Sequence, residues 1–245
     1  MADITNIDIA NDFNGIDMKG LEEYVQSYMS NYNDTSHDWS HIVRVRQMAN
    51  YLVSMENQNE TSYIINRSIV DLAALLHDVG DSKYLKDGHT IEDELRVCMN
   101  QYHVSNDIQD IIVWIVPRIS YSYEVQHSFD HSALYSKELA CVQDSDRLDA
   151  IGAIGIARCF SFNGKRNLPL YNPLIKPLTS EEINNGSYKE QKNKGNARNH
   201  FYEKLLLLSN MMKTKSGKFE SLKRQDMLEL FIKQFDIECN LAECH

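Results

Sequence analysis

Residues 65–80 read Ile-Asn-Arg-Ser-Ile-Val-Asp-Leu-Ala-Ala-Leu-Leu-His-Asp-Val-Gly. The large aliphatic residues of this stretch recur every three or four positions, which predicts a helix with one face against the core. His77 and Asp78 follow the last of them, and Gly80 is a plausible helix stop. An ionised Asp at the end of a buried helix is costly without a partner. A divalent metal ion is one such partner, because it binds a neutral imidazole together with a carboxylate.

The same helical spacing extends over almost the whole chain. Only 10 glycines and 4 prolines interrupt it, and no stretch shows the alternation of a β-strand between turn signals. The sequence therefore predicts an all-α fold that ends in a C-terminal helical pair. Besides the helix described above, we expect helices near residues 18–32, 89–103, 105–117, 130–142, 145–161, 196–213 and 218–238.

Four segments can be drawn along the chain. Residues 1–16 are polar and without a period, which predicts a flexible N-terminal arm. Residues 17–161 are predicted to form the metal-binding core. Residues 162–195 contain three of the four prolines and an Asn-Asn-Gly sequence, a composition typical of a long loop or lid. Residues 196–245 are predicted to form C-terminal helices that pack on the same domain.

Charge and cysteine content exclude several classes of protein. The net charge is −10 and no run of five Lys or Arg occurs, so we expect no nucleic-acid duplex as a partner. A small phosphorylated molecule stays open, because a metal ion can supply the positive charge. The odd number of cysteines, five, without a C-x-x-C pair fits a reducing compartment. We expect a cytoplasmic protein, with the nucleus as an alternative, and no signal peptide or membrane helix.

Two further positions could complete a metal site with the His-Asp pair. His41 begins an amphipathic helix, where a lone histidine is more often structural. Asp146 stands in a run with Asp144 and Asp149 before an apolar stretch, and acids there commonly cap a helix. Two imidazoles and two carboxylates suit Mn²⁺, Fe²⁺, Co²⁺, Ni²⁺ or Mg²⁺ with water in the open positions, and suit structural zinc poorly. The residues alone leave the metal site and the structural interpretation both open.

Four motifs together resemble one protein family, the HD-domain metal-dependent phosphohydrolases. Their flanking residues resemble a branch of bacterial Mn²⁺-dependent nucleoside-triphosphate pyrophosphohydrolases, and the resemblance covers about residues 20–236. It implies an HD-domain helical bundle. The implied metal is Mn²⁺, with Co²⁺, Ni²⁺, Fe²⁺ and Mg²⁺ as alternatives. The motifs are His37-Asp38-Trp39-Ser40-His41-Ile42-Val43-Arg44-Val45, Ala74–Lys83, Asp144–Arg158 and His200–Leu205, and the implied metal ligands are His41, His77, Asp78 and Asp146.

The resemblance also implies a reaction. We expect hydrolysis of a nucleoside or deoxynucleoside triphosphate to the monophosphate and pyrophosphate, by a water that the metal activates. One alternative is a phosphomonoesterase similar to 5'-nucleotidases that acts on small phosphorylated metabolites. Another is an HD fold that binds ligands without catalysis. The expected partner is a nucleotide or phosphorylated metabolite, and a homodimer is left open.

Further roles can be assigned around the four ligands. Asp81 is the candidate base beside Asp78, because a continued helical turn would put Asp81 and His77 on one face. Asp149 is expected to orient a ligand or Arg147. Each candidate phosphate contact has a plainer alternative as a member of a surface ion pair. These candidates are Lys83, Arg44, Arg118, His200 and Lys204.

Overall fold

The computed structural model describes residues 15–31, 36–58, 63–80, 85, 88–127, 129–184 and 195–243. Within these ranges all regular structure is helical, which confirms the predicted all-α class. The α-helices are α2 (Met18–Ser30), α3 (Trp39–Gln58), α4 (Arg67–Leu76), α5 (Ile91–Gln101), α6 (Asn106–Ile115), α7 (Tyr121–Gln126), α8 (Ser136–Asp149), α9 (Gly152–Lys165), α10 (Ser180–Asn184), α12 (Ala197–Glu203) and α13 (Lys215–Glu243), and the 3₁₀ turns are η1 (Val116–Arg118) and η2 (Leu205–Met211).

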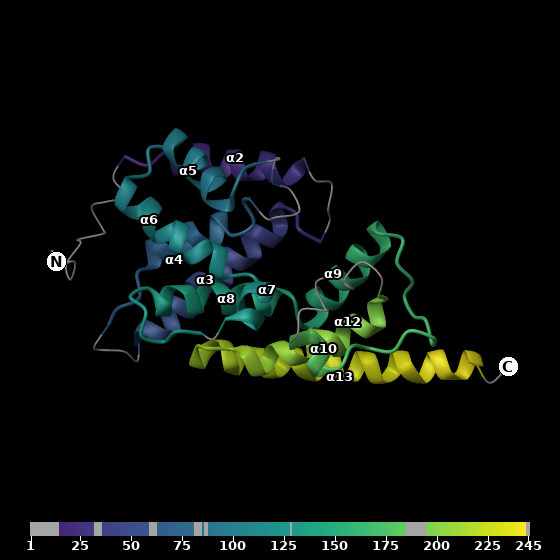
Figure 1. Ribbon diagram of the computed structural model, residues 1–245. Helices are drawn as coiled ribbons and strands as arrows, with labels where there is room; N and C mark the ends of the chain where they lie inside the picture. Colours follow the sequence, from purple (N-terminus) through teal and green to yellow (C-terminus); the bar gives the residue numbers. More distant parts are fainter. Residues whose placement is uncertain are drawn as a thin grey trace.

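Helices α3, α4 and α8 form the centre of the fold, and each packs against the other two. In α4 the side chain of Asn66 caps the first turn by accepting a hydrogen bond from Ile69 N at 3.0 Å. The residues from Leu72 to Leu76 are fully buried, so this helix is apolar on nearly every side. Helices α2, α5 and α6 lie around the same centre (Figure 1). The predicted helix over 65–80 therefore forms the core, but it begins at Arg67.

Helix α8 is unusual because its buried residues include four charged side chains. Buried charges are costly unless they are paired or hydrogen-bonded within the fold. Each of these four has such a partner, as described below, and α8 therefore carries a polar spine through the interior. The residues are Glu138, Asp144, Arg147 and Asp149.

Helix α13 joins the two ends of the molecule, and in Figure 1 it runs beneath α8, α9 and α12. It spans 29 residues. Its Phe231 ring stacks on Phe201 of α12 at 5.6 Å between centroids and meets Phe160 of α9 at 5.7 Å. Aromatic pairs at such distances add to the apolar area that the rings bury. The predicted C-terminal pair is thus present. Helix α12 with η2 forms its first member, and the long helix α13 packed on them forms the second.

The predicted helix break near residue 144 is wrong. Helix α8 continues to Asp149, and the break falls at Ile151, before Gly152 with φ +70°. Asp144 therefore does not cap a helix over 145–161. Its carboxylate instead accepts hydrogen bonds from Thr214 N and Thr214 Oγ1, both at 2.7 Å. It thereby anchors the turn that precedes α13.

The segment expected as a loop or lid, residues 162–195, begins inside α9, which ends at Lys165. It also includes α10, while residues 185–194 lie outside the described ranges. Its movement and the four-segment division of the chain stay predictions. No helix in the described part of the chain combines the length and the apolar character needed to cross a bilayer.

Candidate metal centre

Two imidazoles and two carboxylates from three separate parts of the chain meet at one point. The Nε2 atoms of His41 and His77 lie 3.1 Å apart. Asp78 Oδ2 lies 3.4 Å from His41 Nε2 and 3.5 Å from His77 Nε2. Asp146 Oδ1 lies 3.7 and 3.9 Å from the same two nitrogen atoms. Helix α3 supplies His41, the turn after α4 supplies His77 and Asp78, and α8 supplies Asp146.

The other ring nitrogen of each histidine faces an acceptor. His41 Nδ1 lies 2.7 Å from Asp149 Oδ2, and His77 Nδ1 lies 2.8 Å from the carbonyl oxygen of Ala74. Each Nδ1 therefore carries a hydrogen, and when the ring is neutral its Nε2 presents a lone pair to the shared point. Two lone pairs at this separation repel each other unless a proton or a cation lies between them.

The two carboxylates also call for a cation at this point. Asp78 Oδ2 is buried and has no hydrogen-bond partner, which is a costly arrangement without an ion. Burial raises the pKa of Asp78, but the nearby imidazoles of His77 and His41 outweigh it, and the net pKa is lowered well below the ordinary value. The pKa of Asp146 is also lowered, because His77, His41 and Arg147 outweigh burial. His41, His77 and Asp146 form a group that could hold a metal ion, and the orphaned oxygen of Asp78 lies beside them, so the donor types fit a divalent cation.

Asp149 contacts the Nδ1 side of the His41 ring, and two arginines contact Asp149. Arg44 donates from Nε to Asp149 Oδ1 at 2.7 Å and from an amino group to Oδ2 at 3.0 Å. Arg158 donates to Oδ2 at 2.9 Å. Burial raises the pKa of Asp149, but the hydrogen bonds from His41 and Arg44 outweigh it, so the carboxylate stays ionised. Asp149 is thus placed to fix both the ring and the tautomer of His41.

A second polar network lies on the other side of Asp146. Arg147, which is 2% exposed, lies 3.6 Å from Asp146 Oδ2 and donates to Glu124 Oε2 at 2.6 Å. The Glu124 carboxylate also accepts a hydrogen bond from Lys213 Nζ. Lys213 N donates to Asp144 Oδ1 at 3.0 Å. The network therefore ties α7 and the turn before α13 to the helix that carries Asp146.

The remaining predicted residues are placed as follows. Arg118 stacks over the Trp114 ring at 4.7 Å and donates to the carbonyl of Trp114, within a small cavity that the four clustered side chains do not line. Lys204 lies over the Tyr121 ring at 5.1 Å, and His200 lies one turn earlier on α12. Asp81 and Lys83 lie outside the described residues. The continued helical turn that favoured Asp81 is absent, because α4 ends at Leu76 and Gly80 has φ +76°.

Sequence reasoning missed most of the supporting residues. Arg158 closes the motif that begins at Asp144, but its role required the contact with Asp149. Of the two partners predicted for Asp149, a ligand or Arg147, the structure shows contact with the proposed ligand His41, and Arg147 pairs with Glu124. The available signal was Arg147, which stands directly after Asp146 and two positions before Asp149. An arginine that is buried at such a position needs partners from elsewhere in the fold. Nothing in the local sequence pointed to Glu124 or Lys213.

Comparison with known proteins gives the family. No protein-family model matches the chain. A solved HD-superfamily hydrolase from Bacillus thuringiensis is 32% identical, with a TM-score of 0.62 over 91% of this chain and 96% of that one. An uncharacterized protein of Acanthamoeba polyphaga mimivirus is 30% identical over 213 residues, which are 79% of this chain and 84% of that protein. The chain belongs to the HD superfamily.

A third relative of this HD-superfamily chain is YpgQ of Bacillus subtilis, whose structure has been solved in complex with ADP. It is 28% identical in that complex, with a TM-score of 0.65 over 90% of this chain and 96% of YpgQ. These likenesses support a metal-binding hydrolase and agree with the resemblance drawn from the motifs. They leave the substrate and the identity of the metal undecided.

Proposed function

We propose that this HD-superfamily chain is a divalent-metal-dependent nucleotide phosphohydrolase, with Mn²⁺ as its metal. One observation carries the proposal. The Nε2 atoms of His41 and His77 lie 3.1 Å apart, and the ionised carboxylates of Asp78 and Asp146 face them. The proposed ligands are His41, His77, Asp78 and Asp146. When bound there, a divalent cation supplies Lewis-acid activation of water and of the phosphoryl oxygen.

The protein groups around the ligands divide the remaining tasks. Asp149 keeps His41 in the tautomer that presents Nε2, and Arg147 restrains Asp146. Asp81 is the proposed group that orients water. The proposed contacts to phosphoryl oxygens are Lys83, His200 and Lys204, because charge that develops on these oxygens needs cations. Arg44 keeps its proposed role in phosphate binding, although its guanidinium is already bound to Asp149.

The finer proposal is hydrolysis of a nucleoside triphosphate to the monophosphate and pyrophosphate. Two observations support it. The motifs resemble the branch that performs this reaction, and the relative YpgQ has been crystallised with ADP. The net charge of −10 and the absence of a run of five Lys or Arg disfavour a long polyanion, which favours a small phosphorylated substrate over a nucleic acid.

The test begins with elemental analysis of the purified protein. A panel of nucleoside mono-, di- and triphosphates is then incubated with the metal found, and phosphate and pyrophosphate are assayed separately. Pyrophosphate from a triphosphate supports the finer proposal, whereas orthophosphate from a monophosphate supports a phosphomonoesterase. Absence of turnover with Mn²⁺, Co²⁺, Ni²⁺ and Mg²⁺ alike would support an HD fold without catalysis.

The ligand assignment has its own test. Asp78→Ala and Asp146→Ala should each lose bound metal and activity and keep the helical circular dichroism signal. Asp226→Ala is a matched control, because Asp226 is exposed on α13. Turnover that persists in either ligand variant would contradict the assignment.

A further inference from the structure

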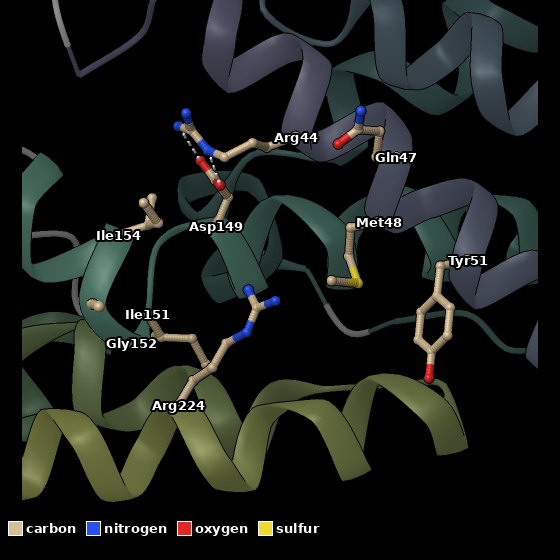
Figure 2. A pocket seen from close by; sticks show the side chains of 10 residues that line it. Arg44, Gln47, Met48, Tyr51, Asp149, Ile151, Gly152, Ile154 and Arg224 are labelled. Carbon is tan, nitrogen blue, oxygen red and sulfur yellow. Dashed lines mark hydrogen bonds and ion pairs between the residues drawn. The ribbon is translucent and has the colours of Figure 1, made fainter.

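A cleft of about 420 Å³ opens behind the proposed metal centre, between α3, the start of α9 and α13 (Figure 2). Asp149 lines it, and none of the four proposed ligands does. Its volume falls within the range of small-molecule sites. The lining side chains include two arginines, one tyrosine and one methionine, namely Arg44, Arg224, Tyr51 and Met48.

Arg224 is the first reason to expect an anion in this cleft. It is half-buried, and one of its N–H groups donates to the carbonyl oxygen of Leu148 at the end of α8. No carboxylate among the described residues forms an ion pair with it within 4.0 Å, although the charges of Glu220 and Asp149 act on it from farther away. Gly152 lets α13 approach closely, since a Cβ there would lie 3.1 Å from Arg224 Cβ. A guanidinium has five N–H donors, so most of those on Arg224 remain available to a ligand.

A second cation reaches the same space. Arg44 lines the cleft with its guanidinium bound to Asp149, and Figure 2 shows both side chains at one end, above Arg224. The first turn of α9 adds partial positive charge, because Ile151 provides no side-chain cap for it. Two arginines thus line one cavity, with Asp149 drawn between them in Figure 2, and a guanidinium matches the geometry of a phosphate group.

The opposite end of the cleft is apolar. Met48 and Tyr51 form its wall on α3, whereas Ile154 of α9 lies at the other end, near Asp149 (Figure 2). Tyr51 is 40% exposed and Ile154 is 45% exposed, so both have surface that a ligand could cover. A flat, partly apolar group such as a nucleobase suits this wall.

We propose that this cleft is a second ligand site, which binds a nucleoside phosphate with its phosphate between Arg224 and Arg44 and its base against Met48 and Tyr51. The site lies beside the metal centre, shares Arg44 with the proposed catalytic site and needs no metal. A phosphate there competes with Asp149 for Arg44, and Asp149 orients His41. Occupancy of the cleft is therefore coupled to the metal centre, and by linkage the coupling acts in both directions.

The experiment measures ADP binding by isothermal titration calorimetry to the chelator-treated, metal-free protein. Saturable binding is expected, and Arg224→Met should weaken it about tenfold or more, because a charged hydrogen-bonding group is lost. Lys223→Met on the exposed face of α13 is the matched control and should leave binding unchanged. Inorganic phosphate should bind more weakly than ADP, and adenosine more weakly still.

The coupling also predicts a variant whose affinity for ADP rises, whereas Arg224→Met lowers it. Asp149→Asn releases Arg44 from its carboxylate partner, so ADP should bind several-fold more tightly to this variant. The gain should disappear in Asp149→Asn combined with Arg44→Met. No binding to the wild-type protein, or equal binding to wild type and Arg224→Met, would overturn the proposal. Turnover is not measured, so these outcomes are independent of the proposed catalytic function.

Discussion

His41 Nδ1 lies 2.7 Å from Asp149 Oδ2, although the two residues are 108 positions apart in the chain. The contact decides which nitrogen of His41 carries the hydrogen, and hence which nitrogen is available to a metal ion. It is buried and supported by two arginines. A cation site at Nε2 therefore depends on an interaction with α8 that does not involve the cation itself.

Asp149→Asn should weaken Mn²⁺ binding by about 10–100-fold, as is typical when a residue that supports a ligand is changed. The amide of Asn can donate a hydrogen bond to Nδ1, which would move the hydrogen of His41 to Nε2 and block the lone pair. Isothermal titration calorimetry with Mn²⁺ measures the effect. Asp226→Asn is the exposed control, and an unchanged affinity in Asp149→Asn would show that Asp149 does not act on the ligand.

Arg147→Met should lower the free energy of unfolding by about 3–5 kcal/mol, because it leaves Glu124 buried with only Lys213 as its ion-pair partner. Urea denaturation measures the loss. In a double-mutant cycle, Glu124→Gln should be much less harmful in the Arg147→Met background than in the wild type. Additive losses would mean that the two side chains are not coupled.

Gly152→Ala should lower the free energy of unfolding by about 1–3 kcal/mol, because φ is +70° there and the new methyl group would press on Arg224. Gly164→Ala is a control in the same helix, where an added Cβ meets nothing within 4 Å. Its stability should be unchanged or raised by up to about 1 kcal/mol. Equal effects of the two changes in thermal or urea unfolding would argue against the strained turn.

Glu138 should make the protein less stable as the pH rises from about 4.5. Burial raises its folded-state pKa above the ordinary 4.5, although Asn66 N and Tyr63 donate hydrogen bonds to it. Below pH 4.5 both folded and unfolded states hold the proton. As pH rises through this window the unfolded state releases it first, so stability falls until the folded-state pKa is passed.

Urea unfolding at several pH values tests this prediction. The stability of wild type minus that of Glu138→Gln should decrease as the pH rises above about 4.5. The exposed Glu181→Gln variant should follow the wild-type pH dependence. A constant difference between wild type and Glu138→Gln would contradict the prediction.

Local sequence was sufficient where one helix face or one motif carried the signal. The apolar face before His77 predicted the buried α4, and the motifs named His41, which the structure brings next to His77 and Asp146. Local sequence failed near Asp144, because a run of acids resembles a helix start. In the structure these acids lie in the last turns of α8, where their partners come from α3, α9 and the turn before α13.

The sequence by itself determined the helical class and named four side chains with the donor types of a divalent-metal site. The tertiary structure alone decided that these side chains converge, that Asp149 contacts His41, and that Arg224 lines a cleft without an ion pair within 4.0 Å among the described residues. The physical reason is the separation along the chain of the residues that each effect involves. Helical periodicity and capping depend on residues within one or two turns, whereas the protonation and pairing of buried charges depend on groups that only folding brings together.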